Sequence, residues 1–179
     1  MLNNLGFRLM ALEYRLRDLF RPPGWILRQV GVRPGMAVLD FGCGPGSFSL
    51  AAADLVGSEG RVYAVDTHPL AISLVRRAAK RRGINHLEAI HGDRLPRVPD
   101  GSVDIALLYD VLHEIREPAP TLGEIRRVLK RDGLLSVTDH HLEEASLLGK
   151  VTGDGLFRLV RGGKGTFQFE PAKGTGTEA

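Results

Sequence analysis

The chain has 179 residues, of which 43% are hydrophobic, and a formal net charge of +3 at pH 7. This length suits one ordinary domain, and this hydrophobic content is normal for a chain that buries a sizeable core. The single cysteine excludes an internal disulfide and any metal site built from several thiolates. No apolar run approaches the roughly 20 residues that a membrane helix needs, and the charged N-terminal residues do not form a signal-peptide pattern. We therefore expect a cytoplasmic protein without a membrane span.

Apolar residues at helical spacing predict an amphipathic helix over residues 7–20. Pro22, Pro23 and Gly24 interrupt it, and a second short helix is expected over 25–30. This predicts an N-terminal helical cap over residues 1–34, a core over 35–170, and a tail rich in glycine and threonine over 171–179.

Beyond residue 35, short apolar runs alternate with amphipathic stretches, which predicts strands separated by helices. The predicted strands are 36–41, 61–65, 87–91, 105–109 and 134–139, followed by a hairpin of 156–160 and 166–170. The predicted helices are 47–55, 69–82, 111–116, 120–130 and 142–150. Repeated strand–helix units closed by a hairpin indicate a doubly wound α/β sheet with an antiparallel end.

The most informative stretch is Val-Leu-Asp-Phe-Gly-Cys-Gly-Pro-Gly, residues 38–46. An apolar run ends in a carboxylate and then breaks into three glycines at alternate positions. The glycines let a ligand lie against the backbone, and the following helix offers N–H donors and partial positive charge. A dinucleotide fingerprint would need a glycine at position 47, where this chain has Ser47. The turn therefore predicts a site for a polar ligand that carries an anionic group.

Asp-x-Gly-x-Gly-x-Gly resembles the first motif of the class I S-adenosylmethionine-dependent methyltransferases, and the resemblance covers roughly residues 24–170. It implies a mostly parallel seven-stranded sheet of order 3-2-1-4-5-7-6, with strand 7 antiparallel and helices on both faces. It also implies S-adenosyl-L-methionine as the methyl donor and S-adenosyl-L-homocysteine as the product.

Acidic residues end several predicted strands, where ligands lie in doubly wound sheets. The resemblance implies that Asp40 reaches the methionine end of the cofactor and that Asp66 accepts from both ribose hydroxyls. Thr67 would lie near the adenine, Asp93 would accept from the adenine amino group, and the backbone N–H of Arg94 would meet a ring nitrogen. With the glycines and a carbonyl of strand four, the implied cofactor-binding set is Asp40, Gly42, Gly44, Gly46, Asp66, Thr67, Asp93, Arg94 and Leu108.

Each acid also has a structural interpretation: Asp40 and Asp93 could stabilise local turns, and Asp66 could be the N-cap of a helix that begins near Pro69. These alternatives stay open at the level of the sequence.

Methyl transfer from a sulfonium is an in-line displacement, which depends mainly on alignment and on exclusion of water. A general base is needed only where the acceptor must lose a proton early. The sequence contains no recognisable catalytic triad. The candidates for a base or an orienting group are Tyr109, His113 and His141, with His140 beside them. Each could instead be a packed, capping or surface residue. We expect no metal site, because adjacent residues such as 139–141 seldom face one centre.

The Val-Leu-His sequence after strand four looks like the small-molecule branch of the family, and the signature of enzymes that methylate nucleobase or glutamine amides is missing there. The leading hypothesis is methyl transfer to carbon, oxygen or nitrogen of a small molecule, and the motifs resemble those of quinone-type C-methyltransferases. Arsenite methylation is disfavoured because the cysteines that it needs are missing.

The alternatives are an RNA or protein methyltransferase that docks through the basic residues 76–82, or a non-catalytic protein that binds S-adenosylmethionine. An NAD-dependent oxidoreductase ranks below these, since Ser47 and the closing hairpin both count against it. A second subunit could complete the acceptor pocket in a homodimer.

Overall fold

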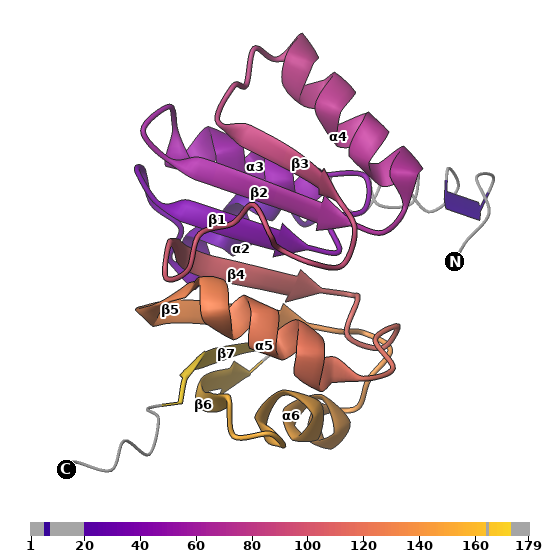
Figure 1. Cartoon of the computed structure of the whole chain (residues 1–179), viewed down its shortest axis with the longest axis vertical. Coiled ribbons are helices and arrows are strands. Elements are labelled where there is room, and N and C mark those ends of the chain that lie inside the picture. The colour runs from indigo at the N-terminus through magenta and orange to yellow at the C-terminus, as the bar shows by residue number, and fades with distance from the viewer. Residues whose placement is uncertain (1–5, 8–19, 164, 173–179) are drawn as a thin grey trace. The chain divides into compact units, whose positions relative to one another are not determined.

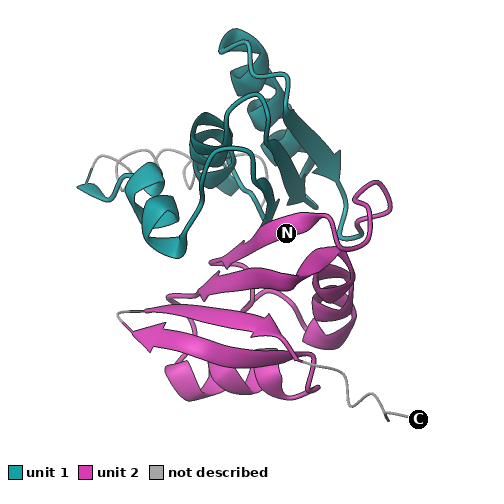
Figure 2. Ribbon diagram, turned by 90° about the vertical axis from the view of Figure 1, so that its left-hand side faces the viewer, with its two compact units in different colours: residues 1–94 teal, residues 95–179 magenta. Residues whose placement is uncertain are grey.

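The computed structural model describes residues 6–7, 20–163 and 165–172 (Figure 1). Its strands form a seven-stranded sheet of order β3-β2-β1-β4-β5-β7-β6, in which β7 runs antiparallel to both of its neighbours. The predicted strand order and the antiparallel β7 are therefore confirmed. The chain divides into two units, residues 1–94 and residues 95–179 (Figure 2).

Unit 1 contains a parallel three-stranded part of the sheet, in which β2 pairs with both β1 and β3. Its elements are α2 (Pro23–Val30), β1 (Ala37–Phe41), α3 (Ser47–Val56), β2 (Arg61–Asp66), α4 (Pro69–Arg81) and β3 (Leu87–His91). Helix α3 packs on β1 and β2, and α4 packs on β2 and β3. One core cluster of unit 1 consists of Cys43, Ala64, Ile72, Val75 and Ala89.

Local sequence explains where the helices of unit 1 begin and end. Helix α2 has proline in its first turn, where the missing N–H costs nothing, and it ends at Gly31 in a left-handed conformation (φ 104°). Helix α4 begins after His68, whose ring Nδ1 accepts a hydrogen bond from the backbone N–H of Leu70 at 3.2 Å. A histidine therefore caps α4, with Pro69 in its first position.

Unit 2 contains β4, which pairs parallel with β5, and the antiparallel strands β7 and β6. Its elements are β4 (Val103–Tyr109), α5 (Pro118–Val128), β5 (Leu129–Thr138), α6 (Glu144–Thr152), β6 (Phe157–Gly163) and β7 (Thr166–Pro171). Strand β4 is buried at every position but Asp104, which explains its continuous apolar sequence.

Two predicted elements of unit 2 are wrong. The predicted helix over 111–116 is a turn, because Asp110 takes a left-handed conformation (φ 52°) that breaks helical geometry directly after β4. The fifth strand begins at Leu129 and not at residue 134, and the helix before it ends at Val128. Asp132 and Gly133 form an irregularity within the strand, since the register with β4 shifts between Val103 and Ile105.

Most of the predicted helix over 7–20 and most of the tail over 171–179 fall outside the described residues, so the division into cap, core and tail stays a prediction. Phe7 is described, and its side chain is buried. Its ring stacks on His68, with 4.4 Å between the ring centroids. The N-terminal segment thus contacts the residue that caps α4. Within the described ranges, no helix has the length and apolar character to cross a membrane.

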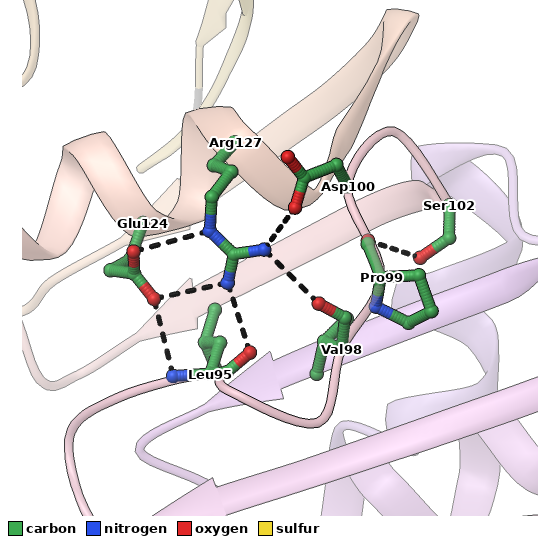
Figure 3. A network of polar contacts seen from close by, with 7 residues as sticks. All are labelled: Leu95, Val98, Pro99, Asp100, Ser102, Glu124 and Arg127. Atoms are coloured by element: carbon green, nitrogen blue, oxygen red, sulfur yellow. Dashed lines mark hydrogen bonds and ion pairs between the residues drawn. The ribbon is translucent and has the colours of Figure 1, made fainter.

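A guanidinium in unit 2 fastens the loop before β4 to helix α5 (Figure 3). Arg127 donates to the carboxylates of Glu124 and Asp100, and to the backbone carbonyls of Leu95 (2.9 Å) and Val98 (3.2 Å). Glu124 also accepts from the backbone N–H of Leu95 at 3.3 Å. Hydrogen bonds to Glu124 and Asp100 raise the pKa of Arg127 above its usual value. One planar fork therefore satisfies groups on both sides of the loop.

We expect Arg127→Lys to lower the free energy of unfolding by about 1–3 kcal/mol, because a compact ammonium cannot reach all four partners at once. Denaturant unfolding would measure the change. Arg126→Lys, one residue earlier in α5, is the matched control and should shift stability by less than about 0.5 kcal/mol. Equal effects of the two substitutions would contradict the structural role of the Arg127 fork.

Candidate functional site

The glycine turn between β1 and α3 has a backbone that only glycine adopts easily. Gly42, Gly44 and Gly46 have φ values of 78°, 51° and 92°. At Gly46 a side chain would also collide, since an added Cβ would lie 2.7 Å from Cγ2 of Val75. Close packing against α4 therefore requires glycine at position 46, as the backbone conformation also does.

Asp66, at the end of β2, is fixed by two backbone donors. Its Oδ2 accepts from the N–H of Gly44 at 2.8 Å, and its Oδ1 accepts from the N–H of His68 at 2.7 Å. A carboxylate oxygen has two lone-pair sites, so each oxygen keeps one for a ligand. The side chain is only partly buried. The N-cap of α4 is His68, so the alternative interpretation of Asp66 as the N-cap of this helix is wrong.

The loops after β2 and β3 are tied to each other. Nε2 of His91 lies 3.0 Å from the carbonyl oxygen of Thr67, and the N–H of Gly92 donates to the carbonyl of Asp66 at 2.9 Å. Thr67 is exposed, as are Asp93 and Arg94 in the loop that follows β3. Unit 1 therefore brings the predicted ribose and adenine residues onto two joined loops.

Asp40 is the most deeply buried acid of the glycine turn region, with 3% of its surface exposed. Its carboxylate accepts a hydrogen bond from the hydroxyl of Ser49 in the first turn of α3. Burial raises the pKa of Asp40 to about 6; the Ser49 hydrogen bond opposes this rise and the nearby charge of Asp66 adds to it. The negative charge of Asp40 is thus poorly compensated, which suits a cationic ligand group.

Cys43, in the middle of the turn, is buried. Burial raises the pKa of its thiol well above the usual value, and the charges of Asp40 and Asp66 raise it further. The thiol therefore stays neutral and does not act as a nucleophile.

In unit 2, the structure places two of the predicted residues in the interior. Leu108 is fully buried in β4. Tyr109 is nearly so, and its hydroxyl lies 2.8 Å from the hydroxyl of Ser136 on the neighbouring β5. This hydrogen bond favours a structural role for Tyr109 over that of a base.

Two histidine–aspartate pairs connect the chain beyond β4 with the chain beyond β5. Asp139, after β5, pairs with His113 in the turn after β4, at 3.0 Å from Oδ2 to ring Nδ1. Conversely, Asp110, after β4, pairs with His140 after β5, at 2.7 Å from Oδ1 to Nδ1. His141 also belongs to this cluster, since its ring centroid lies 4.3 Å from that of His113.

Asp139 differs from Asp40 because donors surround it. Burial alone would raise its pKa, but the ring and backbone N–H of His113 and the backbone N–H of His141 together lower it below the ordinary value. Its carboxylate is therefore ionised at neutral pH. Within the part of the chain that the structure describes, no group of three or more His, Cys, Asp or Glu residues could hold a metal ion.

The sequence interpretation missed two residues that contact the predicted site residues. Ser49 carries no motif, and only the packing of α3 on β1 reveals its bond to Asp40. Asp139 had an available signal, because it lies at the end of a predicted strand, as Asp40 and Asp66 lie at or near the ends of theirs. Its hydrogen bond to His113 could not be predicted without the turn after β4.

Because the pKa of Asp40 is raised from 3.8, its protonated form is favoured in the folded protein. Its contribution to stability is complete below about pH 4 and is lost as the pH rises through about 6. We expect Asp40→Asn, which cannot ionise, to gain roughly 2–4 kcal/mol relative to the native protein between pH 4 and 7. Urea unfolding across this range would measure it. Asp54→Asn, at a half-exposed acid, is the control; parallel pH curves for native protein and Asp40→Asn would contradict the burial argument.

Comparison with known proteins assigns the family. A family model described as "Methyltransferase domain" matches residues 33–157, more than half of the chain. A demethylmenaquinone methyltransferase from Geobacillus stearothermophilus is 32% identical over 111 residues, which cover 61% of this chain and 47% of the relative. The ubiquinone/menaquinone biosynthesis C-methyltransferase UbiE from a Marinomonas species is 31% identical over 138 residues, covering 75% of this chain and 54% of the relative.

The chain thus spans about half the length of these curated relatives. Among solved structures, a SAM-dependent methyltransferase from Aquifex aeolicus superposes with a TM-score of 0.73 at 26% identity, covering 84% of this chain and 88% of the other. The extent of the family match and this agreement in fold lead to one conclusion: the chain belongs to the methyltransferase domain family.

Proposed function

We propose that this chain transfers a methyl group from S-adenosylmethionine to a small-molecule acceptor. The observation that carries the proposal is the Asp66 carboxylate, which the N–H of Gly44 and the N–H of His68 hold beside the glycine turn. A carboxylate fixed in this way, with lone-pair sites left over, is suited to a pair of ribose hydroxyls.

The other residues of unit 1 fit the remaining parts of such a cofactor. Asp66 would bind the ribose, while Thr67, Asp93 and the backbone of Arg94 would meet the adenine. The backbone of Gly42, Gly44 and Gly46 would lie against the ligand, although the missing Cβ of Gly46 makes room for Val75. A carbonyl near Leu108 in unit 2 stays a predicted partner of the cofactor's amino group.

Asp40 supports a cationic ligand end by its energetics. Burial raises the pKa of its carboxylate to about 6, so its negative charge is destabilised. An ammonium group nearby, directly or through water, would stabilise that charge. Bound S-adenosylmethionine would supply an electrophilic methyl group on sulfur, and the chain's own contribution is to align the acceptor and exclude water.

Two observations support a small-molecule acceptor. The names of the relatives describe methylation of small molecules: demethylmenaquinone for one, and ubiquinone and menaquinone biosynthesis for another. In addition, the basic helix is partly occupied by contacts within unit 1. Arg76 donates to the carbonyl of Ala89 at 2.8 Å, and Arg82 forms an ion pair with Asp54. These contacts favour a structural role for the cluster over RNA docking, for which salt-dependent RNA binding would be the sign.

A cytoplasmic location and a homodimer are part of the proposal and come from the sequence alone. Cell fractionation and the mass of the protein in solution would test them.

Ligand-dependent melting tests the proposed cofactor. We expect S-adenosylmethionine and S-adenosylhomocysteine to raise the melting temperature. At a ligand concentration of 100 times the dissociation constant, binding adds about 2.7 kcal/mol to the free energy of unfolding. NAD should have no effect, because Ser47 replaces the third glycine of a dinucleotide fingerprint. Stabilisation by NAD without stabilisation by S-adenosylhomocysteine would refute the proposal.

Asp66→Asn tests the residue that carries the proposal. An amide has one acceptor oxygen where the carboxylate has two, and it carries no charge, so we expect S-adenosylhomocysteine binding to weaken by about 1.5–3 kcal/mol. Calorimetric titration would measure the affinity. Asp54→Asn, at an acid of α3 that pairs with Arg82, is the control and should bind as the native protein does. Unchanged affinity in Asp66→Asn would remove this carboxylate from the site.

A further inference from the structure

The carboxylate of Asp139 is held in a single orientation by His113 and His141. Its Oδ2 accepts from the backbone N–H of His113 at 2.9 Å, and its Oδ1 accepts from the backbone N–H of His141 at 3.0 Å. Ring Nδ1 of His113 lies between both oxygens, at 3.1 Å from Oδ1 and 3.0 Å from Oδ2. The side chain of Asp139 is fully buried, whereas 26% of the His113 side chain is exposed.

This geometry decides which nitrogen of His113 carries the proton. An ionised carboxylate only accepts hydrogen bonds, so Nδ1 must be the donor. A neutral imidazole has one N–H, which leaves Nε2 with its lone pair. Among the described residues, Nε2 has no hydrogen-bond partner. The partly exposed ring thus keeps a basic nitrogen, and the buried carboxylate of Asp139 fixes the orientation of the ring.

The other ionisable groups near this ring are few. His141 packs against it, and Asp139 lies behind it. Glu114 follows His113 in the same turn and is exposed, while Asp110 and His140 form their own pair at the ends of the same two strands. Tyr109 is engaged with Ser136, so it does not compete as a base.

We propose that His113 is the general base for an acceptor with an acidic O–H group, such as a phenol or a hydroquinone, and that Asp139 is its positioning residue. The proposal rests on the proposed methyl transfer. It selects this acceptor class because imidazole titrates near neutral pH and can take a proton from such a hydroxyl. A carboxylate acceptor is already an anion, and an amine can lose its proton to water after transfer, so neither needs a base held in this way.

The step balances without a further reactant. Nε2 takes the hydroxyl proton, and the electron pair of the O–H bond stays on the acceptor. That pair, on oxygen or on a conjugated ring carbon, forms the new bond to the methyl carbon while the methyl–sulfur bond breaks and its electrons stay on sulfur. The products are methylated acceptor and neutral S-adenosylhomocysteine. If carbon is methylated, the ring loses its C–H proton and the oxygen regains one, which restores the hydroxyl, while His113 releases its own proton to water.

The tautomer can be tested without any substrate. Long-range ¹H–¹⁵N correlation spectra of the native protein should show His113 protonated on Nδ1 and bare on Nε2 at a pH where the ring is neutral. In Asp139→Asn we expect the ring to lose this fixed tautomer. A native His113 that carries its proton on Nε2 would overturn the proposal, because no base would then face the acceptor.

The catalytic role is tested with labelled S-adenosylmethionine and four probes: 1,4-naphthohydroquinone and catechol as hydroxyl acceptors, benzylamine and 2-phenylethylamine as amines. We expect the native protein to methylate a hydroxyl probe, and His113→Asn, whose amide can still donate to Asp139, to lower kcat by about 10²–10⁴-fold. Free imidazole should restore part of the activity of His113→Ala, which a purely structural role would not allow. His86→Gln, in unit 1 and bonded to the carbonyl of Ala53, is the control.

Binding of S-adenosylhomocysteine separates this proposal from the proposed function. All variants should bind it as the native protein does, since His113 and Asp139 lie outside the cofactor-binding set. A native protein that does not bind it refutes the proposed function. A native protein that binds it and methylates only the amines, or neither kind of probe, overturns the acceptor class. Loss of kcat by less than about threefold in His113→Asn overturns the base.

Discussion

The hydrogen bond from the N–H of Gly44 to Asp66 joins the two features on which the candidate site depends. The glycine turn after β1 and the acid at the end of β2 belong to neighbouring parallel strands, so both lie at the same edge of unit 1. The N–H of Gly44 orients the carboxylate of Asp66. The same hydrogen bond stabilises the left-handed conformation of the glycine turn. A side chain at Gly46 would press on Val75 and disturb both, so the packing of α4 and the shape of the site are one constraint.

Two buried carboxylates near strand ends, Asp40 and Asp139, have pKa values shifted in opposite directions. Asp40 has one side-chain donor, Ser49, and its pKa rises because burial dominates. Asp139 is also enclosed, yet donors from two histidines lower its pKa. The number of donors, and not burial alone, decides whether the pKa of an enclosed acid is raised or lowered. The same fold thus places an under-compensated acid in one unit and a compensated one in the other.

The sequence predicted the sheet well because apolar runs and turn residues are local signals, and the strand order followed from the family resemblance. It failed where a single backbone angle decides the structure. Asp110 turns left-handed after β4, so the apolar residues beyond it form a turn, although their spacing suits a helix. Likewise, Asp132 and Gly133 read as a strand boundary but form an irregularity inside β5. For the candidate site, the acids at strand ends were predictable, whereas Ser49 and the crossed histidine–aspartate pairs depend on contacts between distant segments.

Cys43 is a natural chemical probe of local opening of the glycine turn. It is the chain's single cysteine, and burial, together with the charges of Asp40 and Asp66, raises the pKa of its thiol and keeps it protonated. Alkylating reagents attack thiolates that they can reach, so this sulfur reacts only when the turn opens to water. The rate at which this thiol is alkylated therefore measures how often the turn opens locally, and no introduced label is needed.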